Sequence, residues 1–370
     1  MPTSAEPLWG SGSESFSVRL GLGRSAIGLM LVCYRSTEYE SNVTRTMSAA
    51  VTTVDHYRFD AADLRVGQRR PGISAFMRIR DGAFSVEAAI RSHIGHYDEI
   101  VAVYNRCTDE TPAILARLQH ELGPKLCIFH YVPPVFPPGS ERHRTTPAEH
   151  PQSLVNYYNF ALSRTRYSHV TKLDDDHVAM DQPTARLVAD VRAGRAGQGE
   201  LACFSGLNLA RDTAGHLGIL AREPFAGSGD HWIFPVRPDT YFVHDRRFEL
   251  LQHPGMPRRF HSFVYWHLKY LKPEFGFANY DLADNPQSRY ARRLAALESD
   301  RTVIGTPALA SGRVPGLGAW LARHGLPLIE RDRIIADRSV AARALADTPL
   351  EAMMARDPHL DPFIAAQDSA

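Results

Sequence analysis

The chain has 370 residues, 44% of them hydrophobic, so it is long enough to form a sizeable core. Lysine and arginine number 42 against 41 aspartate and glutamate residues, which leaves a formal net charge of +1. This balance argues against a nucleic acid or an anionic membrane as the main partner, because a protein with almost no net charge has no overall electrostatic field that attracts either of them. We therefore expect a small or neutral partner.

The cysteine spacing argues against a zinc knuckle and against a disulfide framework. No C-x-x-C pair occurs among the four cysteines, Cys33, Cys107, Cys127 and Cys203. The longest apolar run near the N-terminus, residues 26–34, is too short to span a bilayer. We predict a cytoplasmic protein without a signal peptide or transmembrane helix.

The N-terminal region shows neither helical nor strand periodicity for long. We expect residues 1–70 to form a partly irregular arm, and Met47 offers a second start. Residues 1–46 could therefore be an over-called extension of the reading frame. Mass spectrometry of natively expressed protein would test this hypothesis, and an intact Met1 would end it.

Strands and helices alternate from Pro71 onward. Apolar and β-branched runs predict strands at 73–79, 100–104, 126–131 and 168–173. Helical spacing of apolar residues predicts helices at 83–93, 111–122 and 153–162. This alternation predicts an α/β fold with a mixed, mainly parallel sheet flanked by helices, whose ligands bind at the carboxyl ends of the strands. The connection at 133–151 is too long for a routine loop, so we expect it to border a site.

An acidic run, Asp174-Asp175-Asp176, directly follows the last of these strands. Three carboxylates at the end of a buried strand repel one another, and a divalent cation is the simplest compensation. Oxygen ligands suit Mg²⁺ or Mn²⁺, which would take further ligands from water and substrate phosphates. The alternative is a solvated turn in which Asp174 or Asp176 caps a helix that begins near Asp181 or Pro183.

The segment from Asn156 to Met180 resembles family 2 and related glycosyltransferases of the GT-A fold. In those enzymes, a helix with an N-x-A step precedes a strand that ends in a D-x-D motif. The matching positions here are Asn159-Phe160-Ala161 and residues 174–176. The resemblance covers roughly residues 70 to 270 and rests on short motifs.

The turn from Asn105 to Thr111 is similar to a second motif of these enzymes, D-x-S-x-D-x-T. Asp109 and Thr111 match that pattern. Asn105 stands where the family usually carries an aspartate that contacts the nucleobase or ribose, so the identity of the base is left open.

The resemblance implies a GT-A catalytic domain at 71–280, followed by a mostly helical extension at 281–370. It also implies a metal that bridges the phosphates of a nucleoside diphosphate sugar, with Asp176 as the direct ligand and Asp174 near the ribose or a metal-bound water. Contacts to the donor are expected from Arg78, Arg80, Asn105, Asp109, Asp174, Asp175 and Lys269. For the two arginines, the alternative is an ordinary charged strand edge.

The general base is expected in the glycine-lined loop at 225–232. Inverting transfer needs a group that takes the proton of the acceptor hydroxyl. Asp230 is the first candidate, and its position resembles the family's E-D motif, although Gly229 replaces the first acid. Glu249 and Asp245 are reserves, and an exposed turn is the alternative.

A late histidine completes the metal site in many GT-A enzymes. His267, with Lys269 beside it to assist the departing diphosphate, resembles that arrangement. His261 is the second candidate, and a packed core histidine is the alternative for either.

The C-terminal part is expected to be helical at 331–345 and 349–354. Ile334, Ile335 and Val340 with flanking arginines leave a peripheral membrane contact open, although the mixed charges favour an ordinary surface helix.

Together these features predict a metal-dependent, inverting glycosyltransferase that uses Mn²⁺ or Mg²⁺. It would move a sugar from a nucleoside diphosphate sugar to a saccharide or glycolipid acceptor, in surface polysaccharide assembly by family resemblance. A sugar nucleotidyltransferase is one alternative, for which residues 78–82 make a poor phosphate loop. A non-catalytic carbohydrate-binding relative is another.

Overall fold

The computed structural model describes residues 51–138, 140–227, 231–244, 249–280, 282–284, 286–311, 317–326 and 329–365. Residues 48–370 form one compact unit, and the boundaries expected at 70 and 280 stay predictions. The expectations for residues 1–50, including the second start, lie outside the described residues. No helix in the described part of the chain is long and apolar enough to cross a membrane.

The described strands are β1 (Thr52–Val54), β2 (Arg70–Ile79), β3 (Glu99–Tyr104), β4 (Leu126–Tyr131), β5 (Tyr167–Leu173), β6 (His177–Ala179), β7 (Leu201–Arg211), β8 (Leu217–Leu220), β9 (Phe225–Ala226), β10 (Trp232–Pro235), β11 (Phe242–His244), β12 (Glu249–Leu251), β13 (Arg258–His267) and β14 (Val303–Ile304). The α-helices are α1 (Val86–His93), α2 (Thr111–Leu122), α3 (Glu141–Thr145), α4 (Leu154–Ser163), α5 (Asp181–Arg192), α6 (Arg289–Ser299), α7 (Leu317–Arg323), α8 (Glu330–Arg343), α9 (Leu350–Met354) and α10 (Asp361–Ile364).

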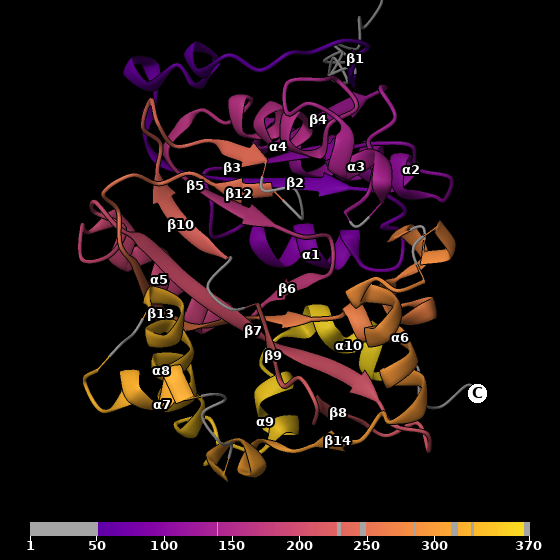
Figure 1. The fold of residues 1–370 in the computed structure, drawn as a ribbon, viewed down its shortest axis with the longest axis vertical. Helices are drawn as coiled ribbons and strands as arrows, with labels where there is room; N and C mark the ends of the chain where they lie inside the picture. Colours follow the sequence, from indigo (N-terminus) through magenta and orange to yellow (C-terminus); the bar gives the residue numbers. More distant parts are fainter. Residues whose placement is uncertain are drawn as a thin grey trace, which may run out of the picture. The chain divides into compact units, whose positions relative to one another are not determined.

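The main sheet has the strand order β1-β4-β3-β2-β5-β10-β7-β13-β6, as Figure 1 shows in part. The first five strands in this order pair in parallel. β10 then runs antiparallel to both β5 and β7, β13 runs parallel to β7, and β6 is antiparallel to β13. The α/β class with a mixed sheet, flanking helices and a helical C-terminal part, as predicted from the sequence, is confirmed.

The predicted elements between 73 and 173 correspond to β2, α1, β3, α2, β4, α4 and β5. Helix α1 begins later than expected because the preceding turn is held by the start of α2. The Gly82 amide donates to Thr111 Oγ1 at 2.8 Å, and the Ala83 amide donates to Asp109 Oδ2 at 2.9 Å. The long connection at 133–151 contains α3, whose first turn is capped by the Ser140 side chain.

Alternation along β2 divides the core into two faces, because successive side chains of a strand point to opposite sides. Ala75, Met77 and Ile79 pack with residues of α1, α2 and α5. Phe76 points the other way and packs with residues of α4. The sheet is therefore buried on both faces, as expected of parallel strands.

Two buried asparagines of α4 fasten neighbouring segments to the sheet. Asn159 donates to the carbonyl oxygen of Phe242 at 2.9 Å and accepts from the amide of the same residue at 2.7 Å. Asn156 accepts from the Phe59 amide and donates to the Tyr57 carbonyl, both at 2.9 Å. The asparagine of the N-x-A step thus satisfies backbone groups of β11.

The C-terminal helices pack onto the second half of the sheet. Trp266 Nε1 donates to Asp357 Oδ2 at 2.7 Å, and the other oxygen of Asp357 accepts from the Asp181 amide at 2.8 Å. Ile334 is fully buried and packs in the core beneath α4. The membrane contact that the sequence leaves open for this helix therefore cannot include Ile334, whereas Val340 is exposed.

The buried His93 of α1 should make the stability of the protein depend on pH. Burial lowers the pKa of His93 to about 4 from an ordinary value of 6.5. As the pH falls, the unfolded chain therefore takes up this proton first, so stability declines between about pH 6.5 and pH 4. Between pH 7 and pH 5 the loss due to His93 is about 2 kcal/mol.

Urea denaturation of the wild type and of His93→Phe at pH 7 and pH 5 measures this loss. The variant keeps the aromatic volume beside Tyr97, and we expect its stability to fall by about 2 kcal/mol less than that of the wild type. Equal declines in the two proteins would contradict the prediction.

Candidate functional site

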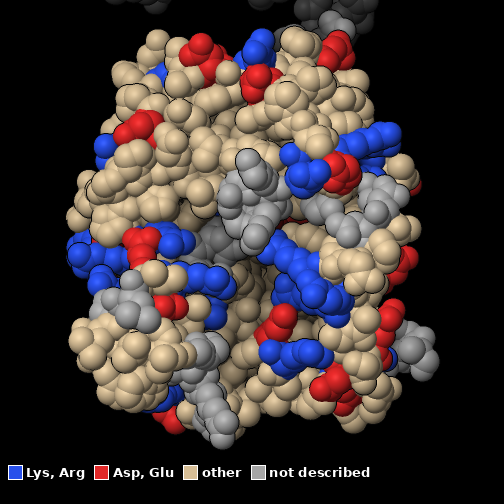
Figure 2. All heavy atoms as spheres, viewed as in Figure 1, with Lys and Arg blue, Asp and Glu red and all other residues tan. Residues whose placement is uncertain are grey.

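A cavity of about 1590 Å³ lies at the carboxyl ends of β2 and β5. Its walls come from the first half of the sheet, from the segment after β13, and from α6 and α8. Figure 2 shows a hollow in the viewed face with lysine and arginine side chains on both sides. The acidic run lines this cavity, as expected of a ligand site in a parallel sheet.

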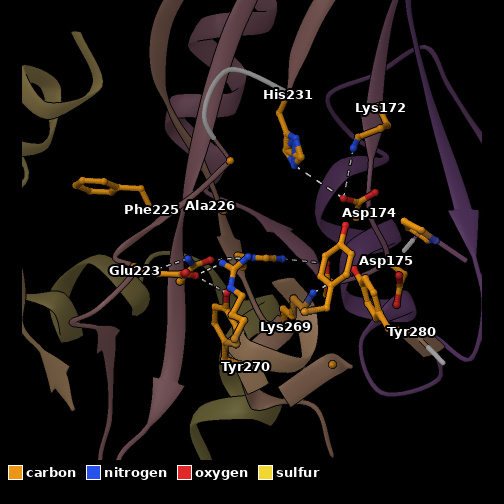
Figure 3. A pocket seen from close by; sticks show the side chains of 18 of the residues that line it. Lys172, Asp174, Asp175, Glu223, Phe225, Ala226, His231, Lys269, Tyr270 and Tyr280 are labelled. Carbon is orange, nitrogen blue, oxygen red and sulfur yellow. Dashed lines mark hydrogen bonds and ion pairs between the residues drawn. The ribbon is translucent and has the colours of Figure 1, made fainter. Parts of the chain in front are cut away.

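Asp174 is surrounded by cationic groups and imidazoles from four segments. Arg78 donates to its Oδ1 at 3.3 Å, and Lys172 Nζ lies 3.7 Å from Oδ2. His177 and His231 place Nε2 at 3.7 Å and 3.8 Å from Oδ2. In Figure 3, Lys172 and His231 point at Asp174 from different strands. Burial raises the pKa of Asp174, but these neighbours lower it more, so the carboxylate stays ionised.

Lys272 bridges the other two carboxylates of the run. Its Nζ lies 2.7 Å from Asp175 Oδ2 and 3.0 Å from Asp176 Oδ2. Burial raises the pKa of Asp175 above its ordinary value in spite of this contact. For Asp176, burial also raises the pKa, but Lys272 and His267 together bring it well below the ordinary value. Asp176 is therefore the more firmly ionised of the two.

The protein's own cations thus compensate part of the acidic charge. The expectation that a metal is the simplest compensation is incomplete, because Lys272, Lys172 and Arg78 already supply positive charge within hydrogen-bonding or ion-pairing distance. Lys272 carries a raised pKa, since both carboxylates stabilise its charge against the effect of burial.

His267 is oriented toward Asp176 by a neighbouring asparagine. Its Nδ1 lies 2.5 Å from Asn208 Oδ1, while Asn208 Nδ2 donates to the Glu223 carbonyl at 2.7 Å. The second bond identifies Oδ1 as the acceptor, so Nδ1 of His267 carries the proton. The lone pair of Nε2 then faces Asp176 Oδ1 at 3.5 Å, an arrangement that needs a proton or a metal ion between the two atoms.

His177 adds a buried nitrogen to the same place. It is fully buried and its ring stacks on Tyr265 with a centroid distance of 3.8 Å. Strand pairing sets it opposite His267, and its Nε2 has no hydrogen-bond partner among the described residues. The Asp174 amide lies 3.5 Å from His177 Nδ1, so in the neutral ring Nε2 carries the proton and faces Asp174 Oδ2.

The donor set fits a divalent metal. Ligand atoms of Asp176, His177 and His267 lie within 4.8 Å of one another, and the same holds for Asp174, His177 and His231. Carboxylates suit Mg²⁺ and Mn²⁺, and imidazoles also bind divalent transition metals, so the mixed set fits a divalent cation.

Arg78 lies between the acidic run and an aromatic ring. Its guanidinium sits 3.3 Å from the ring centroid of Tyr158, and its Nε is buried without a partner in the described part of the chain. Such a shielded cation can hold an anionic group of a ligand.

The other predicted donor contacts are placed differently. Arg80 and Asn105 line the cavity, but the Asn105 amide nitrogen donates to the carbonyls of Tyr131 and Pro133. Asp109 does not line it, and both its oxygens accept backbone amides at the start of α2 and in the turn before α1. Roles for these residues in donor binding stay predictions.

Lys269 points toward aromatic rings and not toward the acidic run. Its Nζ lies 3.2 Å from the Tyr280 hydroxyl and 4.2 Å from the ring centroid of Phe277. Burial lowers its pKa, which makes it a weaker cation than Lys272. Lys272 directly follows the 3₁₀ turn Lys269–Leu271 and has an extended backbone, so its side chain points away from that of Lys269, toward the acidic run.

The proposed base lies outside the described residues, as does the reserve Asp245. Asp230 directly precedes His231, which reaches Asp174. Glu249, the other reserve, lines the cavity on β12. His261 lies elsewhere, where it pairs with Glu200 at 3.2 Å.

Asn208, which contacts His267, should contribute to the affinity of the site for a metal ion. Because Asn208 fixes the tautomer and orientation of His267, Asn208→Ala should weaken Mn²⁺ binding by about 10- to 100-fold. Electron paramagnetic resonance of free Mn²⁺ during titration measures this. Asn279→Ala is the matched control, because Asn279 lines the cavity but donates to the Arg80 carbonyl. Equal affinities of wild type and Asn208→Ala would refute the role.

Comparisons with known proteins give likeness in structure alone. No family model matches the sequence, and no curated protein matches it. Glucosyl-3-phosphoglycerate synthase from Mycobacterium tuberculosis, solved with Mg²⁺ and UDP, matches at 17% identity and a TM-score of 0.26, over 44% of this chain and 51% of that chain. S. aureus TarS matches at 14% identity and a TM-score of 0.32, over 80% of this chain and 55% of that one.

The chain thus spans about half the length of each of these two structures. A shorter form, TarS 1–349, matches at 12% identity and a TM-score of 0.31, over 80% of this chain and 93% of that chain. Superpositions at this level carry no argument about activity, which has to come from the site. The fold itself is a mixed α/β sheet with an acidic run directly after a central strand, which agrees with the α/β class that the sequence predicts.

Proposed function

We propose that the chain is a metal-dependent glycosyltransferase that moves a hexose from a nucleoside diphosphate sugar to a saccharide or glycolipid acceptor. One observation carries the proposal: buried carboxylates and imidazoles converge at the end of β5, inside a cavity large enough for two ligands. A solvated turn, the bland alternative for the acidic run, does not account for the burial of Asp176 and His177.

Asp176 and His267 would hold a Mn²⁺ or Mg²⁺ ion, with His177 beside them and Asp174 on the ribose side. The ion would neutralise charge that develops on the departing diphosphate. Lys272 and Arg78 can add charge-assisted contacts to the same phosphates, since both line the cavity and lie beside the acidic run. Lys269 would then bind farther along, near Tyr280.

Asp230 would act as the general base and take the proton of the attacking hydroxyl. Its neighbour His231 faces Asp174, which supports a role for Asp230 near the carboxylates. Attack from the face opposite the diphosphate inverts the anomeric carbon, and NMR of the product anomer tests this. A retained configuration would overturn the inverting part of the proposal.

The turn after β2 argues against a sugar nucleotidyltransferase. A phosphate loop needs open backbone amides. Here a Cβ added to Gly82 would lie 2.8 Å from Asp175 Oδ2, and the Gly82 amide is already bound by Thr111. The turn is therefore packed against the acidic run and not available to cradle phosphates.

We also propose a cellular location and a pathway for the protein. We place the protein in the cytoplasm, in surface polysaccharide assembly, with a peripheral contact to a membrane. The exposed apolar side chains on and after α7 are better suited to that contact than α8, where Ile334 is buried. They are Leu317, Trp320 and Ile329.

Nucleotide binding is the first test. Calorimetric titration of UDP, GDP, CDP and TDP in the presence of Mn²⁺ should show one that binds, and Asp176→Ala should abolish its metal-dependent part, because the variant loses a metal ligand. Asp190→Ala is the control, since Asp190 pairs with Arg195 on exposed α5 and does not line the cavity. No metal-dependent binding of any nucleotide would sink the proposal.

The base is tested by kinetics. Asp230→Asn should lower kcat by about 10²- to 10⁴-fold while nucleotide affinity stays within about twofold, because general base catalysis acts on the acceptor proton and not on the donor. Glu249→Gln is measured in parallel. A large loss in Glu249→Gln and none in Asp230→Asn would transfer the role to Glu249.

A further inference from the structure

Helix α6 presents one basic face to the cavity. Arg289, Arg292 and Arg293 line it together with Ala296 and Leu297, which is the i, i+3, i+4, i+7, i+8 spacing of a single helix face. Figure 2 shows basic side chains at the edge of the hollow. This face lies apart from the acidic run and is not used by the proposed donor site.

The position of Arg289 on α6 is unfavourable for helix stability. Arg289 is the first residue of the helix, where the helix dipole favours negative charge, and the first turn holds no acidic residue. Positive charge there costs free energy unless an anion compensates it. An anionic ligand would provide such compensation.

Among the described residues, few carboxylates lie beside the basic face of α6. Among the described residues that line the cavity near α6, Glu223 is the acidic one, and it is already paired with Arg293 and bonded by the Tyr270 hydroxyl at 2.8 Å. Neither Arg292 nor Arg222 forms an ion pair within 4.0 Å in the described part of the chain, although Arg222 lies near enough to Asp300 to lower the pKa of that carboxyl. Arg222 also makes a long 3.4 Å contact to the Ala296 carbonyl. Both side chains are exposed and face the same cavity.

Two tyrosine rings connect this face with the acidic run. Tyr290, on α6, lies 4.6 Å from Tyr280 between ring centroids, and the Tyr280 hydroxyl accepts from Lys269. Aromatic faces of this kind stack on sugar rings. A ligand can therefore lie over the tyrosines, with one end at the carboxylates and an anionic end at the arginines.

We propose that the arginine face of α6, with Arg222, is a subsite for a phosphate group of the acceptor. The assignment rests on the proposed function, because it gives the acceptor half of that site a substrate class, a saccharide or polyol that carries a phosphate. Arginine suits this role, since its planar guanidinium binds phosphate oxygens in pairs. The donor diphosphate is held elsewhere, at the acidic run.

The test compares matched ligands that differ in the phosphate alone. The full chain, saturated with Mn²⁺ and the nucleotide it binds, is titrated with glucose 6-phosphate against glucose and with glycerol 3-phosphate against glycerol. At least one phosphorylated ligand should bind about tenfold or more tightly than its neutral parent, as expected for one or more hydrogen bonds to a charged group. Arg222→Gln/Arg292→Gln should remove this preference without changing nucleotide affinity.

The control variant is Arg186→Gln/Arg343→Gln, which also removes two exposed positive charges, from α5 and α8, outside the cavity lining. It should keep the preference, which separates a local subsite from a general effect of net charge. Absence of any phosphate preference in a protein that binds nucleotide, or equal losses in both double variants, would overturn the subsite alone. Absence of nucleotide binding would instead overturn the proposed function.

Discussion

The structure depends on the electrostatic cost of three adjacent carboxylates at the end of β5. Each is close to a positive group or an imidazole, and these groups come from distant parts of the chain: Arg78 from β2, His267 from β13 and Lys272 from the segment after it. Strand β6 begins directly after the run and pairs antiparallel with β13. This pairing places His267 against Asp176. The second half of the sheet thus completes an electrostatic site that the first half begins.

The short motifs of the sequence serve this site indirectly. Asp109 and Thr111 resemble donor-binding positions, but in the structure they hold the turn of Gly82 against Asp175. Asn159 likewise fastens β11, which packs beside the cavity. A motif can therefore recur in a fold because the backbone needs it, without touching the ligand. This explains why the motifs indicate the architecture better than they indicate the contacts.

Most of the first half of the fold could be predicted, because its buried strands are continuous apolar runs and its helices have clear periodicity. The acidic run could be recognised from the sequence as a candidate site because it directly follows such a strand. Lys272 and Asn208 could not be found in the same way, since their roles depend on the pairing of β13 with β7 and β6, which no local pattern encodes. The sequence does not distinguish Lys269 from Lys272, because both lie near His267 in the chain. In the structure Lys269 points toward Tyr280 and Lys272 toward Asp175.

The contact between Arg338 of α8 and the carbonyl of Gly227 has a consequence for synthesis of the protein. Residues that line the cavity continue to Ala342, so the ribosome releases the carboxylates well before the arginines and helices that enclose them. A nascent chain that stops short of α8 already holds the carboxylates and Lys272, but it lacks the part of the cavity wall that α8 supplies. The cavity is therefore complete only after the C-terminal part of the chain has left the ribosome.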